Sequence, residues 1–465
     1  GPAGENKVYF ASIEHGPGCS LSRTGVGAVM GDKNLKAIAV HGTRDVNIAL
    51  PEGFYALCQE ILDRSDKVIE YEDNVQHNES HRKRMEGTHY RNFELFRPWK
   101  DGGKVHMDFL ARREAVKTSC YNCQQKCIRS PHTDDGQPIF IKCRSPFRFV
   151  TAADIQDYDF NLHCVSLVQR NGLDIASAAA LCAFAIDLYQ KGILTKEDTD
   201  GLHLEWGNPE VIPALLDKIV RREGIGDVLA NGVYQAAQQI GRGAEQYAYH
   251  FRKLEPRGQT MKIGMAASYL LSDRRDNSKS GGVKGLDGEG GEEGGGGKGG
   301  PAEAINRSYP ADWKKYMSLP GEHNTLSDCL GICYFWLGVH AHPPMRDLDQ
   351  AQLALYATGM DTDEEGITQC VRRARALIRA YNSILGERMT ADDLPDKFYN
   401  DPNGILPSVS HEDLSKAMEE TNRIMGYTAE GIPTEEALYK LGLDYVAREL
   451  DRRGILPKPV SVPVT

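Results

Sequence analysis

The segment from Asp174 to Tyr189 constrains the fold more than any other part of this sequence. It is rich in alanine and apolar at nearly every position. A helix with this composition has no polar face to turn toward water, so it must be buried on all sides by other elements. Further segments show apolar residues at helical spacing, and these are expected to form the surrounding helices. They are residues 51–62, 208–222, 226–240, 363–385, 411–425 and 434–453.

Three regions depart from this helical pattern. Residues 1 to about 45 alternate strand-like runs, at 7–11 and 37–40, with glycine-rich turns. Residues 66–100 are rich in His, Arg, Glu and Asn and have weak periodicity, so we expect an irregular insertion there. Residues 281–300 include twelve glycines and cannot bury enough apolar surface to become ordered. We expect this tract to be a natural flexible loop or, because its neighbours read as folded protein, an engineered linker.

Charge and hydropathy exclude several classes of protein. The formal net charge of −10 argues against a protein that coats nucleic acid, although a local basic patch for an anionic ligand stays open. No apolar run is long enough to span a bilayer, and no leader peptide is visible. The chain starts at Gly1-Pro2 without an initiator Met, so we expect the natural N-terminus to be absent. With 465 residues, there is room for two or three domains.

Three of the eleven cysteines, Cys120, Cys123 and Cys127, have the spacing C-x2-C-x3-C. In a large chain this clustering favours a metal site over disulfides, and a reducing cytoplasm is the expected compartment. Three thiolates so close together can bind three corners of a 4Fe–4S cluster, with a fourth cysteine from elsewhere. Zinc is the main alternative, but the three-residue gap and the lack of a second C-x2-C pair make it weaker. Three ordinary buried thiols are a further alternative.

The fourth ligand is expected far along the chain. The segment 328–333 offers two candidates, Cys329 and Cys333. Three other cysteines lie on apolar helical faces, and we expect them to be core thiols. These are Cys58, Cys182 and Cys370.

A glycine-dense stretch runs from Arg23 to Gly31. Glycines let the backbone turn sharply or approach a ligand closely. The nearby Arg23, Lys33 and Lys36 would attract an anionic ligand. A β-hairpin with tight turns explains the same residues equally well.

Together these features resemble the aldehyde:ferredoxin oxidoreductase family. Residues 1–6 and 25–37 look like the end of that family's first domain, and the C-x2-C-x3-C spacing matches its cluster motif. The family carries two D-x-x-G-L-(D/C) motifs that hold pterins. The second motif corresponds to residues 328–333 here, and the first to residues 169–174, where Gln169 replaces the leading acid.

The resemblance implies a set of cofactors and the residues that bind them. The cofactors are a tungsten bis-pterin, with Mg²⁺ bridging the two pterins, and a 4Fe–4S cluster whose fourth ligand is Cys333 rather than Cys329. Capping of the following helix would also account for Asp174. The cofactor-binding residues would be Arg23, Gly172, Asp174 and Asp328.

The resemblance also implies a mainly α fold with three parts. Residues 1–45 would be the end of a β-rich N-terminal cofactor domain, whose earlier part is missing. Residues 46–253 would form a helical domain with the cluster motif and the first pterin motif. Residues 254–465 would form a second helical domain with the second pterin motif, interrupted by the glycine-rich loop at 281–300.

Within this family, the chain looks closest to the tungsten subunit of the ATP-independent, class II benzoyl-coenzyme A reductases. Three features favour that relationship. The first is the His- and Glu-rich insertion at 71–84, and the second is the sequence Ser-Cys-Tyr-Asn-Cys at 119–123. The third is Cys143, where aldehyde oxidoreductases would carry an acidic residue near the metal.

That relationship implies reduction of the aromatic ring of a coenzyme A thioester to a cyclic dienoyl thioester. A bare radical anion in an apolar pocket is costly, so protons must be delivered together with electrons. Cys143 is the expected tungsten ligand, because a soft thiolate suits a thiophilic metal, although an ordinary buried cysteine is an alternative. His81 is the expected proton donor and Glu72 the second proton carrier, with His77 and His89 as competitors.

The remaining expectations concern the binding partners of the chain and its alternative functions. Arg82, Lys83 and Arg84 would meet the anionic end of coenzyme A, or else form a solvated charged face. The glycine runs lack the setting of a nicotinamide or flavin site, so we expect electrons from an iron–sulfur subunit in a larger complex. The alternatives are an aldehyde oxidoreductase that passes electrons to ferredoxin, whose tungsten typically lacks a protein ligand, and a non-catalytic iron–sulfur fragment.

Overall fold

The computed structural model divides the chain into two compact units, each of which is described by itself. Unit 1 consists of residues 1–42, 71–261 and 394–407, and unit 2 of residues 43–70, 262–393 and 408–465. The residues that the structure describes are 1–16, 18–71, 88–97, 108–124, 126–142, 148–155, 157–256, 269–273, 319–333, 336, 345, 347–400 and 410–457. The glycine tract at 281–300 lies outside them.

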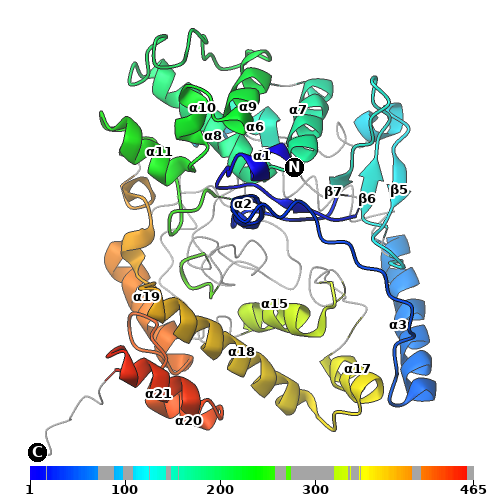
Figure 1. Cartoon of the computed structure of the whole chain (residues 1–465). Coiled ribbons are helices and arrows are strands. Elements are labelled where there is room, and N and C mark those ends of the chain that lie inside the picture. Colours follow the sequence, from blue (N-terminus) through cyan, green and yellow to red (C-terminus); the bar gives the residue numbers. More distant parts are fainter. Residues whose placement is uncertain are drawn as a thin grey trace, which may run out of the picture. The chain divides into compact units, whose positions relative to one another are not determined.

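Unit 1 is built around helix α8, which spans Ile175–Gln190 and is buried along nearly its whole length. This confirms the expected buried helix. Leu181, Phe184 and Ile186 have no exposed surface, and they belong to one apolar cluster that extends into the neighbouring helices. Figure 1 shows these helices side by side. They are α6 (Arg148–Ala153), α7 (Tyr158–Asn171), α9 (Val211–Arg221), α10 (Ile225–Leu229) and α11 (Val233–Ile240).

Short elements complete the described part of unit 1. The helices are α1 (Pro2–Glu5) and α2 (Val26–Asp32), and the 3-10 turns are Ala244–Tyr247 and Asp396–Phe398. The antiparallel strand pairs are β1 (Ile13–Glu14) with β2 (Ser20–Leu21) and β3 (Thr88–Tyr90) with β4 (Leu95–Arg97). A three-stranded antiparallel sheet has the order β5 (Val116–Thr118), β6 (Ile128–Ser130), β7 (Ile141–Lys142).

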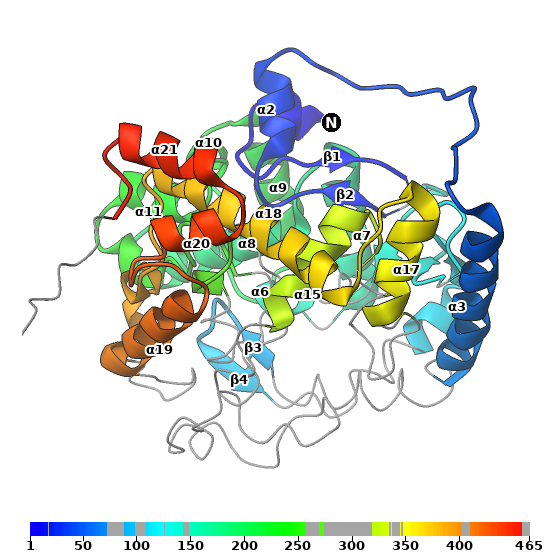
Figure 2. The same cartoon turned by 90° about the horizontal axis from the view of Figure 1, so that it is seen from below.

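Unit 2 is organised by the long helix α18, Glu364–Ile384. Asp363 caps its N-terminus by accepting a hydrogen bond from the backbone N–H of Gly366 at 2.8 Å. The helices α15 (Leu319–Leu330), α17 (Asp347–Thr358) and α21 (Asp444–Arg452) contact α18, and α20 (Glu435–Lys440) packs on α21, as Figure 2 shows. The remaining elements are α3 (Pro51–Tyr71), α19 (His411–Ile424) and the 3-10 turn Ala391–Asp393.

The mainly helical fold is confirmed, but several local expectations are wrong. Residues 37–40 form no strand; Ile38 and Val40 are 74% and 90% exposed, so no apolar burial holds them in a sheet. Of residues 7–11, only Ala11 makes an isolated β-bridge. The insertion at 66–100 begins as the end of α3 and contains the β3–β4 hairpin.

Two expected helices are each divided by a glycine. Gly232 has φ +85° and separates α10 from α11, and Gly442 has φ +65° and separates α20 from α21. A positive φ cannot continue a right-handed helix, and glycine adopts it without steric cost. Among the described residues, no helix is long and apolar enough to cross a membrane.

Candidate functional site

The first predicted pterin motif forms the turn between α7 and α8. Gly172 ends α7 in the left-handed conformation, with φ +69°. Asp174 then caps α8, because its carboxylate accepts a hydrogen bond from the backbone N–H of Ser177 at 2.8 Å. Asp174 is 4% exposed. Capping therefore occupies one carboxylate oxygen of this residue, and its role toward a pterin stays a prediction.

A segment near the N-terminus pairs with this turn. Ala11 forms an antiparallel bridge with Leu173. The backbone N–H of Asp174 donates to the carbonyl of Phe10 at 2.9 Å, and the N–H of Ser12 donates to the carbonyl of Gly172 at 2.8 Å. Segments about 160 residues apart in sequence are thus fixed together by backbone hydrogen bonds at the motif.

Arg23 lies in the same buried region. It is 4% exposed, and its Nη1 is 4.0 Å from the carboxylate of Asp174. Its Nη2 donates to the backbone carbonyl of Glu255 at 2.5 Å. The Glu255 carboxylate accepts from the Ser177 hydroxyl at 2.9 Å and from the N–H of Val233, the first residue of α11, at 2.7 Å. We call Arg23, Asp174, Ser177 and Glu255 the buried polar cluster.

The glycine-dense stretch before and within α2 is a site of close backbone packing rather than a β-hairpin. A Cβ atom on Gly31 would lie 1.7 Å from the carbonyl oxygen of Gly4 in α1, and one on Gly27 would lie 2.5 Å from that of Ser12. Only glycine allows the helices to approach so closely. The hairpin interpretation is therefore wrong, whereas the anion-binding interpretation stays a prediction.

The three clustered cysteines lie on the loop that joins β5 to β6. Cys120, Cys123 and Cys127 are all half-buried and none forms a disulfide. The backbone N–H of Cys123 donates to the carbonyl of Cys120 at 3.1 Å, which closes a turn between the first two. Asn122 and Lys126 have positive φ angles, of +55° and +45°. These residues fold the loop tightly without help from glycine.

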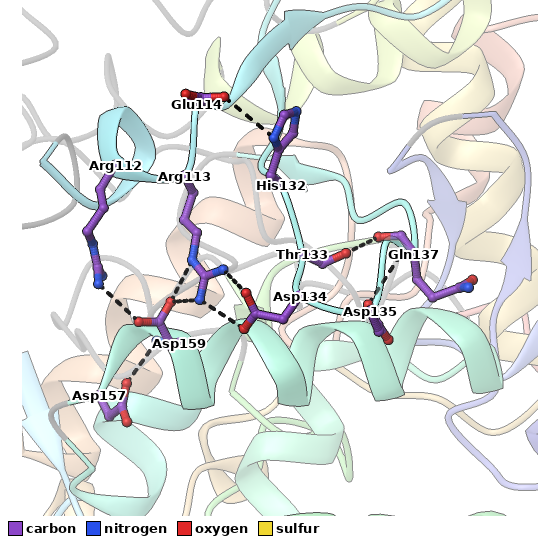
Figure 3. A network of polar contacts seen from close by, with 10 residues as sticks. All are labelled: Arg112, Arg113, Glu114, His132, Thr133, Asp134, Asp135, Gln137, Asp157 and Asp159. Carbon is purple, nitrogen blue, oxygen red and sulfur yellow. Dashed lines mark hydrogen bonds and ion pairs between the residues drawn. The ribbon is translucent and has the colours of Figure 1, made fainter.

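The base of this loop is held by the charged network shown in Figure 3. Arg113, just before β5, bonds Asp159 of α7 through Nε and Nη2, at 2.8 and 2.5 Å. Its Nη1 donates to Asp134, which follows β6, at 2.6 Å. The Arg113 guanidinium lowers the pKa of Asp134 by hydrogen bonding and by its charge. One side chain thereby ties both ends of the β5–β6 hairpin to helix α7.

A fourth cysteine, which the spacing analysis missed, lies beside this loop. The Sγ of Cys19 is 3.4 Å from the Sγ of Cys120. Cys19 precedes β2 and is separated from Cys120 by 101 positions. No short-range spacing pattern in the sequence connects the two.

The thiols fit an iron–sulfur cluster by chemistry and by their position on one loop. Cysteine thiolates are the usual ligands of such clusters. Within the described part of the chain, no three metal-ligating side chains converge on one point. The cluster therefore stays a prediction that is supported by the donor set and not by a preformed geometry.

The second predicted motif, residues 328–333, lies at the C-terminal end of α15 in unit 2. Gly331 has φ +66°, and the N–H of Ile332 donates to the carbonyl of Ser327 at 3.1 Å. This motif thus shares with the first a left-handed glycine that ends a helix. Cys329 and Cys333 are both exposed. Desolvation, and then the charge of the Asp328 carboxylate, raises the pKa of Cys329.

The remaining cysteines differ in their environment. Cys182 is fully buried, as predicted for a core thiol, and burial raises its pKa to about 12. Cys58 is half-buried. Cys370 is exposed, so its assignment to the core is wrong; it lies on the outer face of α18. A further core thiol, Cys164 of α7, is fully buried.

The expected residues of the reaction lie mostly outside the described residues. This holds for Cys143, His81, Glu72 and His77. His89, the remaining competitor for the proton donor, is described. It is 2% exposed, and its ring lies 5.4 Å from Phe93 and 5.2 Å from Phe96 between centroids.

Comparison with known proteins places these features in a family. Residues 78–443 match the family model for domains 2 and 3 of aldehyde ferredoxin oxidoreductase, and residues 1–42 match the model for its N-terminal domain. The tungsten-containing aldehyde ferredoxin oxidoreductase of Pyrococcus furiosus is 28% identical over 95% of this chain and 72% of the relative. A second protein of that organism, an aliphatic sulfonate oxidoreductase WOR-like subunit, is 27% identical over 97% of this chain and 71% of the relative.

A solved structure is similar over almost the whole chain. It is the active-site complex BamBC of benzoyl coenzyme A reductase with 1,5-dienoyl-CoA. The similarity covers 98% of this chain and 75% of that one, with a TM-score of 0.82 and 29% identity. The family model spans most of the sequence, so the chain belongs to the aldehyde ferredoxin oxidoreductase family and is an oxidoreductase.

Proposed function

We propose that this chain reduces the aromatic ring of benzoyl-coenzyme A to a cyclic dienoyl-coenzyme A. One observation carries the proposal: the similarity, at a TM-score of 0.82 over 98% of the chain, to a benzoyl coenzyme A reductase complex that holds a dienoyl-CoA. The coenzyme A thioester is the proposed substrate. An iron–sulfur subunit in a larger complex is the proposed electron donor.

The proposed cofactors are a tungsten bis-pterin, with Mg²⁺ bridging the pterins, and a 4Fe–4S cluster. When bound, the tungsten centre supplies electrons at very low potential and the cluster relays electrons to it. Cys120, Cys123, Cys127 and Cys333 would hold the cluster, and Cys143 would hold tungsten.

The residues of the buried polar cluster support a cofactor role. Arg23 is held by the carbonyl of Glu255 and lies 4.0 Å from Asp174, so a cation and a carboxylate are kept side by side away from water. The turn at Gly172 precedes Asp174, and it is fixed in place because its carbonyl accepts from the N–H of Ser12 at 2.8 Å. Together with Asp328 of the second motif, these residues would bind the polar edges and the phosphates of the pterins.

Cys143 and His81 allow separate tests of metal binding and of proton delivery. Cys143→Ala is expected to release tungsten or abolish activity while iron stays bound. His81→Ala is expected to leave both metals in place and to slow ring reduction by roughly a hundredfold, the scale of a lost general acid. Glu72→Gln is expected to act in the same direction, because the carboxylate would re-protonate His81. Full activity and full tungsten content in Cys143→Ala would refute this part of the proposal.

Aldehyde oxidation is the second candidate function. It is favoured by the relatives in Pyrococcus, which are named tungsten-containing aldehyde ferredoxin oxidoreductases and match 95–96% of this chain. In that reaction the chain would oxidise an aldehyde to a carboxylic acid and pass electrons to ferredoxin.

One pair of assays separates the two functions. The protein, purified without oxygen together with its native partners, is offered cyclic dienoyl-CoA with an artificial electron acceptor, and separately benzaldehyde or acetaldehyde with the same acceptor. Formation of benzoyl-CoA, with aldehyde turnover at least about tenfold slower, supports ring chemistry. The opposite ratio supports the aldehyde oxidoreductase. A preparation that contains iron, lacks tungsten and turns over neither substrate would favour a non-catalytic iron–sulfur role.

A further inference from the structure

The contact between Cys19 and Cys120 is built by parts of unit 1 that are far apart in sequence. Cys19 lies in the turn between β1 and β2, where its carbonyl accepts from the N–H of His15 at 2.9 Å. The preceding Gly18 packs directly on Phe140: a Cβ atom on Gly18 would lie 2.8 Å from the Cβ of Phe140. The β1–β2 turn is therefore seated on the segment that leads into β7.

The segment beneath this turn is itself fixed to α7. The backbone N–H of Phe140 donates to the side-chain oxygen of Gln169 at 3.2 Å, and the amide nitrogen of Gln169 donates back to the carbonyl of Phe140 at 2.6 Å. Gln169 is the position where the first pterin motif departs from its usual acid. A neutral amide can make both bonds, whereas a carboxylate could only accept. Glutamine at position 169, in place of the acid, thus helps to hold the turn that carries Cys19.

The chemistry of the two sulfurs defines which one donates. A Cys120 that binds iron is a thiolate, so it can only accept a hydrogen bond. Cys19, at an Sγ–Sγ distance of 3.4 Å, then has to supply the S–H. Hydrogen bonds to the sulfurs of a cluster favour its reduced, more negative form, and so raise its reduction potential.

We propose that Cys19 is a positioning residue that donates a hydrogen bond to the cluster ligand Cys120 and raises the reduction potential of the cluster. This inference rests on the proposed 4Fe–4S cluster, and it adds a residue outside the C-x2-C-x3-C motif. Cys19 would tune how readily the cluster accepts electrons from the partner without binding iron itself.

The geometry is tested first without any cluster. The full chain is stripped of iron, reduced, and then treated with diamide, which takes up two protons and two electrons as two thiols join in a disulfide. A Cys19–Cys120 disulfide identified by peptide mass spectrometry is the expected result. Cys370→Ala, which removes an exposed thiol of unit 2, serves as the matched control and should leave this disulfide unchanged. Absence of the disulfide would overturn the proposed contact.

The potential is then measured in the complete protein by an electron paramagnetic resonance titration. Cys19→Ala removes the donor and is expected to keep all of its iron, while the ratio of reduced to oxidised cluster at a fixed potential falls roughly threefold to tenfold. A tenfold change corresponds to about 59 mV for one electron. Cys19→Ser retains an O–H donor and should stay close to the wild type.

The outcomes distinguish this inference from the function on which it rests. A wild-type protein without any cluster signal would refute the proposed cluster, whatever the disulfide experiment shows. A wild-type cluster whose potential is the same in Cys19→Ala and Cys19→Ser would overturn the tuning role alone. Loss of iron from both variants would overturn it as well, by making Cys19 an iron ligand.

Discussion

Glu255 is the residue on which the buried polar cluster depends. It is 3% exposed, and its carboxylate is the acceptor for the Ser177 hydroxyl and for the first N–H of α11. Replacing it with alanine leaves both buried donors without this acceptor. Each such loss costs about 1–3 kcal/mol, so we expect Glu255→Ala to lower the free energy of unfolding by about 3 kcal/mol. Urea unfolding followed by circular dichroism measures this change.

Two further variants serve as controls for the stability loss in Glu255→Ala. Glu255→Gln keeps one acceptor oxygen and should lose clearly less stability. Glu223→Ala, at an exposed position between α9 and α10, should stay within about 0.5 kcal/mol of the wild type. Equal losses in Glu255→Ala and Glu223→Ala would show that the buried carboxylate is not a significant support.

His250 makes the stability of the folded protein depend on pH. Burial, and then the charge of Lys253, lowers the pKa of His250 to about 4 from an ordinary value of 6.5. Its ring packs edge-on against the ring of Tyr234, and the two ring centroids are 5.1 Å apart. Between pH 6.5 and 4 the unfolded chain binds a proton that the folded protein excludes. The folded state therefore loses stability as the pH falls through this range, by up to about 3 kcal/mol.

His250→Phe keeps the aromatic packing and removes the titrating group. Unfolding midpoints measured from pH 7.5 to 4.5 should fall less steeply in this variant than in the wild type. The comparison must be made between variants, because Asp187, whose pKa is raised to about 6 chiefly by burial, contributes the opposite slope in the same range. His163→Asn, an exposed position on α7, is the control and should follow the wild type. Parallel wild-type and His250→Phe curves would exclude His250 as the source.

At the scale of elements, the β5–β6 hairpin depends on Arg113. The Arg113 side chain is 18% exposed and contacts two carboxylates. The Arg112 side chain is 61% exposed, lies 3.2 Å from the Asp159 carboxylate, and stacks over the Phe109 ring. We expect Arg113→Gln to destabilise the protein by about 1–2 kcal/mol and Arg112→Gln by less than about 0.5 kcal/mol.

The functional consequence of Arg113 is measured through the cluster loop. Arg113→Gln is expected to release iron to a chelator several-fold faster than the wild type, because the hairpin that carries Cys120 and Cys127 opens more readily. Arg112→Gln should release iron at the wild-type rate. The same rate in both variants would mean that the network does not support the loop.

The elements that sequence reasoning located correctly are those that local pattern determines. Helices α8, α18 and α19 follow from apolar composition or helical spacing together with N-terminal caps at Asp174, Asp363 and Ser410. The strand expected at 37–40 is absent because a short apolar run does not specify a pairing partner. The breaks at Gly232 and Gly442 were missed because a single glycine within a helical pattern does not by itself end a helix.

In the candidate site, too, the parts that depend on local sequence were predicted, and the parts that depend on distant contacts were not. The turn at Gly172 and Asp174 and the cysteine loop are local, so the resemblance to a short family motif pointed to the first and the cysteine spacing to the second. Glu255 and Cys19 contribute through contacts that span 78 and 101 positions, and such contacts have no signature in a single sequence. They became visible only when the packing of α8 with α11, and of the β1–β2 turn with the cluster loop, was known.

At the scale of the whole molecule, the cysteines that we propose as cluster ligands come from two distant parts of the chain. Cys120, Cys123 and Cys127 belong to unit 1, and Cys329 and Cys333 to unit 2. The resemblance of residues 328–333 to the second pterin motif of the family assigns the fourth ligand to Cys333 rather than to Cys329. Cys333→Ala is therefore expected to change the cluster, because three thiolates leave one iron without a protein ligand. Cys329→Ala, which removes a thiol four positions earlier in the same motif, is the matched control.

Metal analysis and spectroscopy of the oxygen-free protein measure this difference. The wild type and Cys329→Ala should contain iron and tungsten in a ratio of about four to one, as a 4Fe–4S cluster with one tungsten centre requires. Cys333→Ala should lose about a quarter of its iron or more, with an altered paramagnetic resonance spectrum. Iron loss in Cys329→Ala with a normal Cys333→Ala protein would exchange the two assignments while retaining the cluster. A normal iron content in both variants would place the fourth ligand elsewhere, and Cys19 would then be the next thiol to test, since it already lies 3.4 Å from Cys120.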